Sequence, residues 1–249
     1  MNYHVDAFSE EIGRRYLWRV YTGIGKYVAK TATHIVADSD FEANYVRNTF
    51  NVRNDKLSTI LLGVDPIFYN RLPKPDNSLE KGAVNLFFVG YLIKRKNVPS
   101  VLYALHELMH RFEIKDVSLT VVGTGLEKGH LLHLAEELGI DGRITWKETL
   151  SNQNLVNEFL KADVFLLLSK SEAYGIAVAE ALSVGAPCIV ADTTALHEFT
   201  KELGCFGVES PPDPQEVAQL ILDISNWHIT TVLSFVPYSN VCCEAVCAN

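Results

Sequence analysis

Short apolar runs alternate with longer amphipathic segments over most of this chain. The apolar runs have strand length and little polar alternation, which is typical of strands buried on both faces. They lie at residues 84–89, 117–122, 144–146, 164–168, 188–191 and 205–208. Segments with helical spacing follow them, at residues 99–112, 127–138, 153–161, 176–183, 196–203 and 213–224. Strands that alternate with helices predict an α/β fold, a Rossmann-like parallel sheet with helices on both faces.

The first quarter of the chain carries a shorter version of the same pattern. Apolar residues recur every four positions from residue 12 to 28, which predicts a helix over about residues 10–30. The elements expected next are a strand at 34–37, a helix opened by the capping box Ser39–Glu42 and a strand at 56–62. These elements predict a small α/β portion ahead of the main sheet.

Breaks in the pattern divide the chain into four parts. Residues 70–82 are polar and carry prolines, so we place a linker at 67–82. Residues 1–66 precede it, and the regular alternation fills residues 83–226. Beyond these the alternation fails, and residues 227–249 form an atypical tail.

Composition narrows the function classes. The chain has 249 residues, enough for one or two domains, and a net charge of −8. An acidic chain is a poor nonspecific nucleic-acid binder, because such binding needs a basic surface. The start of the sequence has no apolar signal-peptide core, and no apolar run reaches the length of a membrane span. We expect a cytoplasmic protein without a nucleic-acid partner, with peripheral attachment to a membrane as an alternative.

The cysteines are unevenly placed. Cys188 and Cys205 lie among apolar residues and are typical of core positions. Cys242, Cys243 and Cys247 crowd the tail, but a nearby His and a second paired half are missing, which disfavours a zinc site. A disordered or non-native tail and a reducing compartment are favoured instead.

Two glutamates follow the apolar run at 164–168. Glu172 is expected in the loop between strand and helix, and Glu180 about two turns inside the helix. Gly175 stands at the turn, and the N–H groups from Gly175 to Ala177 are expected to point outward as an anion site. Two carboxylates flanking a phosphate cradle suit a ligand with hydroxyls at both ends and phosphate between, as in a nucleotide-sugar. Taken singly, a capping group and a surface charge are the alternatives.

Two further loops are expected on the same rim, because ligands bind at the carboxyl ends of parallel strands. Gly90 begins a loop with three consecutive cations, Lys94–Lys96, which can neutralise a diphosphate. A solvated basic loop is the alternative. Gly123 begins a glycine turn after the next strand, but the full G-x-G-x-x-G fingerprint is missing, which disfavours NAD or FAD. His197 follows a later strand, where a lone histidine is more typical of a structural role.

Together these residues resemble the donor-binding half of retaining glycosyltransferases of the GT-B fold, family four (glycosyl transferases group 1). The segment from Glu172 to Glu180 is similar to that family's E-x7-E motif. The continuation E-A-x-x-x-G-x-P is matched at Glu180, Ala181, Gly185 and Pro187. The G-R-L-x-x-x-K-(G/N) loop is matched at Gly90, Leu92, Lys96 and Asn97, and G-V-D at Gly63, Val64 and Asp65. The resemblance covers about residues 33–224.

The resemblance implies a role for each site residue. Glu180 would bind the ribose hydroxyls and Glu172 the hydroxyls of the donor sugar. Lys96 and the backbone near Gly175 would hold the diphosphate. We therefore take Glu172 and Lys96 as catalytic residues. The expected donor-binding residues are Gly90, Arg95, Gly123, Gly175, Ile176, Ala177 and Glu180.

The family's reaction moves a sugar from a nucleotide-diphosphate donor to an acceptor with retention of configuration. The protein's contribution would be positioning and electrostatic stabilisation of the departing diphosphate. The carboxylate pair would then not act as a glycosidase acid and nucleophile. Cationic side chains would stabilise the phosphates, so we expect no metal and no cofactor.

The sequence departs from the family pattern in three ways. Tyr91 replaces the usual Arg, and Arg95 or Lys94 is the candidate replacement cation. Glu148 replaces a usual Gly near the base pocket, which leaves the base open. The third departure is length, since residues 1–66 match only the end of an acceptor-side domain that is on the order of 150 residues in complete members. We expect a truncated or frame-disrupted gene product.

Three functions stay open. The first is sugar transfer from the nucleotide-sugar donor to a carbohydrate or lipid-linked acceptor. The second is a binding module without transfer activity, because the acceptor domain is incomplete unless a separate chain supplies it. The third is a nucleotide-sugar epimerase of the same fold, which would need catalytic acids from both halves.

Overall fold

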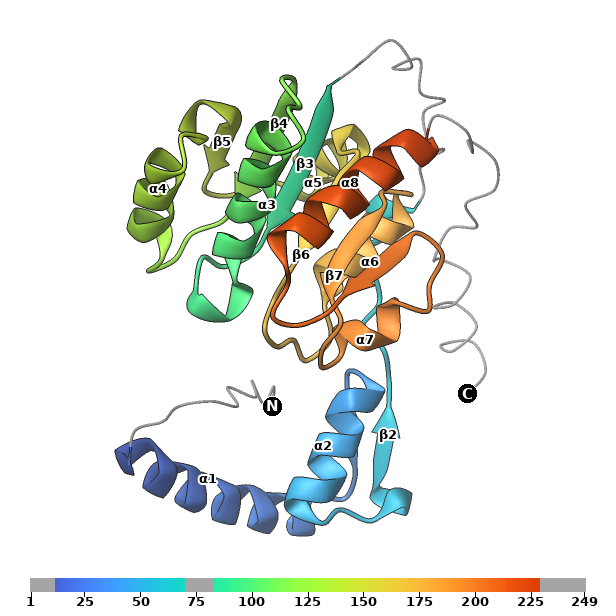
Figure 1. Ribbon diagram of the computed structural model, residues 1–249. Helices are drawn as coiled ribbons and strands as arrows, with labels where there is room; N and C mark the ends of the chain where they lie inside the picture. Colours follow the sequence, from blue (N-terminus) through green and yellow to red (C-terminus); the bar gives the residue numbers. More distant parts are fainter. Residues whose placement is uncertain (1–11, 70–82, 229–249) are drawn as a thin grey trace.

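The computed structural model describes residues 12–69 and 83–228, with side chains from residue 18 to residue 225 outside the gap. We call residues 12–65 the amino-terminal lobe and residues 66–69 with 83–228 the carboxyl-terminal lobe (Figure 1). Most of the expected linker and tail lies outside the described residues, as do Cys242, Cys243 and Cys247.

The carboxyl-terminal lobe is built on one six-stranded parallel sheet. Its strands are β3 (Val84–Val89), β4 (Val117–Val122), β5 (Ile144–Lys147), β6 (Val164–Leu167), β7 (Cys188–Ala191) and β8 (Cys205–Val208). Their order is β5-β4-β3-β6-β7-β8, and every neighbouring pair is parallel. The chain runs outward from β3 to β5 and returns to β6 beside β3, so the winding reverses between β3 and β6. Such a reversal opens a crevice at the carboxyl ends of the two strands.

Helices cover both faces of this sheet. They are α3 (Val98–His110), α4 (Lys128–Glu137), α5 (Asn152–Lys161), α6 (Ile176–Ser183), α7 (Leu196–Phe199) and α8 (Pro214–His228). α3, α4 and α8 lie on one face, and α5 and α6 lie on the other (Figure 1). Every residue of β6 and β7 is buried between these layers. The predicted α/β fold is therefore confirmed.

An aromatic cluster packs one face of the sheet against α5. Phe87, Phe159 and Phe165 meet with ring centroids 5.0–5.8 Å apart. Phe68 adds its ring 6.2 Å from that of Phe159 and is 1% exposed. Phe68 belongs to the short 3-10 helix η2 (Pro66–Phe68). The beginning of the segment expected as linker is thus part of the carboxyl-terminal core.

The amino-terminal lobe is much smaller. It contains α1 (Ile12–Thr31), β1 (Ile35–Ala37), α2 (Asp40–Phe50) and β2 (Leu57–Thr59). β1 and β2 form a two-stranded parallel sheet. Its hydrophobic cluster contains four buried residues, Ala29, Val46, Phe50 and Val52. β2 is shorter than the expected 56–62, because β1 ends at Ala37 and the last N–H to pair across the sheet is that of Ile60.

Two other element ends differ from the sequence expectation. α7 stops at Phe199 instead of continuing to 203, since two successive turns close at Glu202 and Cys205. Gly204 adopts φ +86° between them, a conformation incompatible with a continued helix. α8 runs past 224 to His228.

Candidate functional site

The loops after β3 and β4 meet at the carboxyl rim of the sheet. The N–H of Gly90 donates to the carbonyl of Val122 over 3.0 Å. A side-chain carbon at Gly123 would lie 1.9 Å from the carbonyl oxygen of Gly90, so only glycine fits there. The glycine turn therefore serves close packing of the two loops, which fixes where the cationic loop after Gly90 begins.

Lys96 and Glu172, the two residues expected to be catalytic, lie in direct contact. The Lys96 Nζ donates to Glu172 Oε1 over 2.6 Å, and the Arg95 guanidinium donates to Glu172 Oε2 over 3.1 Å. Arg95 also donates to the carbonyl of Ser171 over 2.6 Å. All three charged side chains are at least four-fifths buried, and that of Glu172 is 8% exposed. A doubly paired carboxylate at this depth fixes both cations on the rim of the crevice.

Backbone contacts hold the same two loops together. Asn97 adopts φ +51°, and its side-chain Nδ2 donates to the carbonyl of Leu168 over 3.0 Å. The N–H of Lys170 donates to the carbonyl of Arg95 over 2.8 Å. The N–H of Glu172 donates to the Thr194 hydroxyl over 3.0 Å. The loop that carries Glu172 is therefore fixed from both sides, by the β3 loop and by the β7 loop.

The start of α6 presents backbone donors four residues after Glu172. Gly175 adopts φ +112° as the residue before the helix, and a side chain there would meet Leu196 at 2.8 Å. Its carbonyl accepts from the N–H groups of Val178 and Ala179. The N–H groups of Ile176 and Ala177 have no acceptor among the described residues. N–H groups without an acceptor at a helix start are suited to bind an anion, and the anion site expected here stays a prediction.

Glu180 lies in a different setting, one turn further along α6. Burial, followed by the charge of the nearby Asp65, raises the pKa of Glu180 to about 7. No described group donates a hydrogen bond to this carboxylate. Asp65 caps η2 through the N–H of Ile67, so the G-V-D segment brings a second acid beside Glu180. A partly buried carboxylate without a donor is suited to accept hydrogen bonds from ligand hydroxyls.

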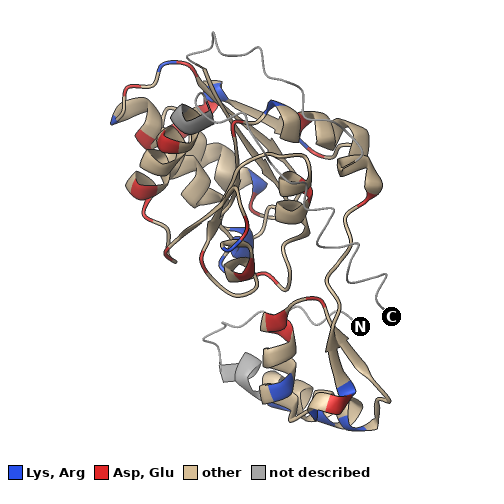
Figure 2. Cartoon of the chain, turned by 90° about the vertical axis from the view of Figure 1, so that its right-hand side faces the viewer, with Lys and Arg blue, Asp and Glu red and all other residues tan. Residues whose placement is uncertain are grey.

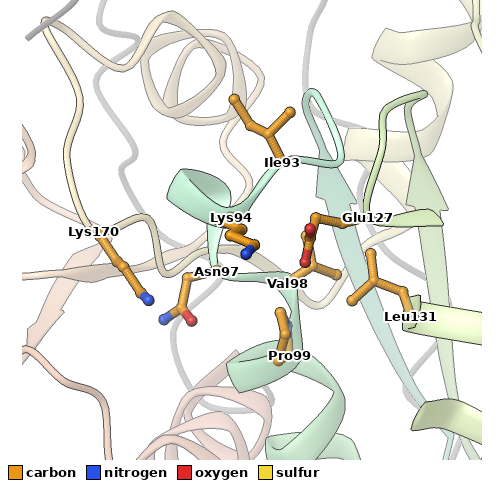
Figure 3. Close-up of a pocket in the computed structure, with 8 residues that line it drawn as sticks. All are labelled: Ile93, Lys94, Asn97, Val98, Pro99, Glu127, Leu131 and Lys170. Carbon is orange, nitrogen blue, oxygen red and sulfur yellow. The ribbon is translucent and has the colours of Figure 1, made fainter. Parts of the chain in front are cut away.

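The structure separates the remaining candidates from this arrangement. Lys94 and Lys170 line a hollow of about 160 Å³ between the β3 loop and α4 (Figure 3). Tyr91 is 71% exposed and Glu148 pairs at the surface with Lys128. Arg95, rather than Lys94, is therefore the cation beside Lys96. The ring of His197 bonds to Asp192 over 2.6 Å.

Two contacts between the lobes could not be predicted from the sequence. Glu198 of α7 accepts from the N–H groups of Phe41 and Asp40 at the start of α2, over 2.7 and 3.3 Å. The Ser39 hydroxyl accepts from the Glu42 N–H and donates to the carbonyl of Ala173 over 2.6 Å. The expected capping box is thus shared with the other lobe. The loop at residues 169–175, which carries Glu172, is thus linked directly to the amino-terminal lobe.

Among the described residues, no cluster of three His, Cys, Asp or Glu side chains is close enough to hold a metal ion. Within those residues no helix is both long and apolar enough to cross a membrane.

Comparison with known proteins identifies the family. The model of the family "Glycosyl transferases group 1" matches residues 73–227, more than half of the chain. The chain belongs to this family. A D-inositol 3-phosphate glycosyltransferase of Nocardia farcinica is 27% identical over 186 residues, which cover 71% of this chain and 41% of that protein. An uncharacterised glycosyltransferase of Methanocaldococcus jannaschii is 25% identical over 198 residues, covering 76% and 48%.

Solved structures of glycosyltransferases show the same fold as this group 1 chain. HepE of Anabaena in complex with UDP-glucose superposes with a TM-score of 0.73 at 18% identity, covering 93% of this chain and 64% of HepE. WaaG, a glycosyltransferase involved in lipopolysaccharide biosynthesis, gives 0.69 at 17% identity, covering 98% and 70%. The expected GT-B fold is confirmed. The chain spans less than half the length of the curated relatives described above.

Proposed function

We propose that the crevice binds a nucleotide-diphosphate sugar and that the chain is part of an enzyme that transfers the sugar with retention of configuration. The observation that carries this proposal is the arrangement of charge along the rim. Lys96 and Arg95 pair with Glu172, and the helix donors at Ile176 and Ala177 follow Glu172 by four and five residues. Glu180 lies one turn further along the same helix.

Each part has a defined task in this proposal. The diphosphate binds between Lys96 and the first N–H groups of α6, where cations and helix donors act on the same anion. The ribose hydroxyls donate to Glu180, and the sugar hydroxyls bind Glu172. As the sugar leaves, charge grows on the diphosphate, and fixed cations stabilise that charge without rearranging. No step needs a metal, and a carbohydrate or lipid-linked acceptor completes the reaction.

Calorimetric titration with UDP and GDP tests donor binding. At pH 8, above the raised pKa of about 7, Glu180→Gln keeps the shape of the side chain but removes its charge. We expect it to weaken binding of the preferred nucleotide on the order of tenfold to a hundredfold, the range for a hydrogen bond to a charged group. Glu137→Gln on the exposed surface of α4 is the matched control. Equal affinities of both variants and the unchanged chain would remove Glu180 from the donor site.

Metal dependence is tested in the same titration. Addition of EDTA should leave the affinity for the nucleotide unchanged, because cationic side chains and backbone N–H groups form the phosphate site. A marked loss of affinity with EDTA, restored by a divalent cation, would contradict the metal-free site.

A second candidate function is a donor-binding module without transfer activity. The described part of the amino-terminal lobe favours it, because it offers only two strands and a hydrophobic cluster of four buried residues as acceptor-side structure. We place the acceptor side at residues 1–66 and donor binding at 83–226, and a separate chain could supply further acceptor-side structure. Incubation of the purified chain with radiolabelled donor and acceptors separates the candidates. Labelled product from this chain alone excludes the module, and its anomeric configuration, read by NMR, tests retention.

A further inference from the structure

Helix α3 carries two histidines on one face. His106 and His110 are four residues apart, so their side chains lie one above the other along the helix. Their rings approach with centroids 4.3 Å apart and an interplanar angle of 39°. His110 is exposed and His106 is half-buried. The segment that joins them reads His-Glu-Leu-Met-His, and H-E-x-x-H is a spacing by which helical histidines bind zinc in metalloproteases.

A backbone contact fixes the protonation of the first ring. The Nδ1 of His106 lies 3.1 Å from the carbonyl oxygen of Leu138, the residue that caps the end of α4. A carbonyl oxygen only accepts, so Nδ1 carries the proton and donates it. The Nε2 of the neutral ring is then a bare acceptor, which is the form in which imidazole binds a metal. Among the described residues, His110 contacts no hydrogen-bond partner that would occupy its ring nitrogens.

We propose that His106 and His110 together bind one divalent transition metal ion of the class of zinc, nickel and copper, the ions that imidazole suits. A tetrahedral zinc ion holds each nitrogen at about 2.0–2.1 Å, so the two nitrogens must come within roughly 3.3 Å of each other. Rings with centroids 4.3 Å apart meet this requirement by rotation about their side-chain bonds. In the part of the chain that the structure describes, no third His, Cys, Asp or Glu side chain joins the pair, so water completes the coordination.

The metal ion would strengthen a contact between two helices. The carbonyl of Leu138 belongs to the end of α4, where a helix leaves its last carbonyls without an intrahelical partner. A metal ion on Nε2 fixes the ring of His106 in the orientation that makes this contact. The folded chain presents the two ligands at helical spacing and the unfolded chain does not. Metal binding should therefore stabilise the carboxyl-terminal lobe.

The histidine pair is separate from the proposed donor site. α3 begins at Val98 beside the rim, and His106 follows eight residues later, about 12 Å along the helix axis. The donor site uses cationic side chains and backbone N–H groups and needs no metal. Removal of a metal ion from the histidines should therefore leave the affinity for the nucleotide unchanged.

Surface charge offers a second, unselective way to hold cations. The chain has 30 acidic residues against 22 Lys and Arg, and Figure 2 shows acidic residues on both lobes. Exposed carboxylates attract divalent cations of every kind, including hard ions such as Mg²⁺ that prefer oxygen ligands. A pair of imidazoles prefers zinc and copper instead. Selection of zinc over magnesium therefore distinguishes the histidine pair from the acidic surface.

Calorimetric titration of the full chain with zinc chloride tests the proposal. All chains carry Cys242→Ser, Cys243→Ser and Cys247→Ser, because thiolates would compete for zinc. We expect one zinc ion per chain, tighter binding of Cu²⁺ in accordance with the Irving–Williams order, and no comparable binding of Mg²⁺. His110→Gln removes an exposed ligand. It should weaken zinc binding by more than the roughly tenfold to hundredfold that loss of an outer-shell partner costs.

Histidines outside the pair serve as controls. His34→Gln removes an exposed ring that bonds to Ser58, and His133→Gln removes a ring on α4 that pairs with Glu137. Both controls should bind zinc as the parent chain does. Zinc should also raise the melting temperature of the parent and of both controls, but not that of His110→Gln. Absence of zinc binding, equal binding of Mg²⁺, or equal losses of affinity in His110→Gln and either control would overturn the proposal.

Discussion

The two lobes are made from the same kinds of elements but differ in how much each can bury. The carboxyl-terminal lobe places six strands between two helical layers, and its central strands are inaccessible to solvent. The described part of the amino-terminal lobe has two strands and a hydrophobic cluster of four buried residues. Parallel strands need cover on both faces, and Val36 of β1 is 52% exposed. The carboxyl-terminal lobe is therefore stabilised by its own buried core, whereas the amino-terminal lobe depends on contacts with its neighbour.

That dependence has a structural basis in the contacts between lobes. Ser39 and the first N–H groups of α2 bond to Ala173 and Glu198 of the larger lobe. Regions with few buried contacts open at low free energy, so we expect the amino-terminal lobe to open before the sheet of the other lobe does.

The largest expected difference between the lobes is the effect on stability of truncating one phenylalanine in each core. Phe159→Ala removes a fully buried ring that touches three others, and should lower the free energy of global unfolding by about 3–5 kcal/mol. Phe50→Ala removes the ring that covers Gly25 and should leave the main transition nearly unchanged. Urea denaturation followed by circular dichroism measures the transition, and hydrogen exchange over residues 40–50 reports local opening. A Phe50→Ala variant that shifts the main transition as much as Phe159→Ala would show that the lobes unfold as one unit.

Removal of the paired carboxylate tests the rim of the larger lobe. Glu172→Gln leaves Lys96 and Arg95 without their anion, which should cost about 1.5–3 kcal/mol of stability. The same change should raise the affinity for pyrophosphate, because the freed cations attract the added anion. Lys96→Met should lower that affinity.

Glu158→Gln is the matched control for this prediction. Glu158 also bonds to two lysines, Lys147 and Lys161, but at the edge strand β5 and helix α5. Thermal melts and pyrophosphate titrations of the three variants form the measurement. If Glu158→Gln raised pyrophosphate affinity as much as Glu172→Gln, the effect would be one of net charge and not of the rim.

Removal of the contact between the lobes should have a smaller effect on stability. Glu198→Ala removes the acceptor for the first N–H groups of α2, and loss of such a cap costs about 0.5–2 kcal/mol. We expect faster hydrogen exchange in α2 and unchanged exchange in β6 and β7. Glu202→Ala in the following turn is the control. Unchanged exchange in α2 would mean that Glu198 does not stabilise the amino-terminal lobe.

The smallest expected effect is the pH dependence carried by Glu180. Because burial and then Asp65 raise the pKa of this group to about 7, the folded chain holds a proton there that the unfolded chain has lost. The stability that goes with this proton is complete below the ordinary Glu pKa and is lost as pH rises through 7. Glu180→Gln should therefore melt higher relative to the unchanged chain at pH 8 than at pH 5. The difference is small because the carboxyl is partly exposed and screened. A difference that does not change between these pH values would contradict the raised pKa.

Hydrophobic periodicity predicts the sheet well, because each buried strand can be recognised from its own run of apolar residues. All six strands of the larger lobe lie within about two residues of their expected positions. The positions of Gly90, Gly123 and Gly175 at turns could also be predicted, since positive φ favours glycine. The winding of the sheet then explains why Lys96 and Glu172 meet.

Contacts made across the fold could not be predicted in the same way. Thr194, Ser39 and Glu198 form hydrogen bonds with residues at least 22 positions away in the sequence. The residues that flank them in the sequence do not indicate which partners they will contact. Glu172 was expected to face a ligand, yet the structure also gives it two cationic partners. The individual roles of Glu172, Lys96 and Glu180 in catalysis and donor binding stay predictions.

The bond between Lys96 and Glu172 joins positions that are 76 residues apart, with two complete strand-and-helix units between them. Closing so long a loop costs chain entropy, so we expect β3 and β6 to come together only after the intervening units have packed. We therefore expect this rim to form late in folding. Ligand capture at this rim can report, in a refolding experiment, the moment at which the larger lobe becomes complete.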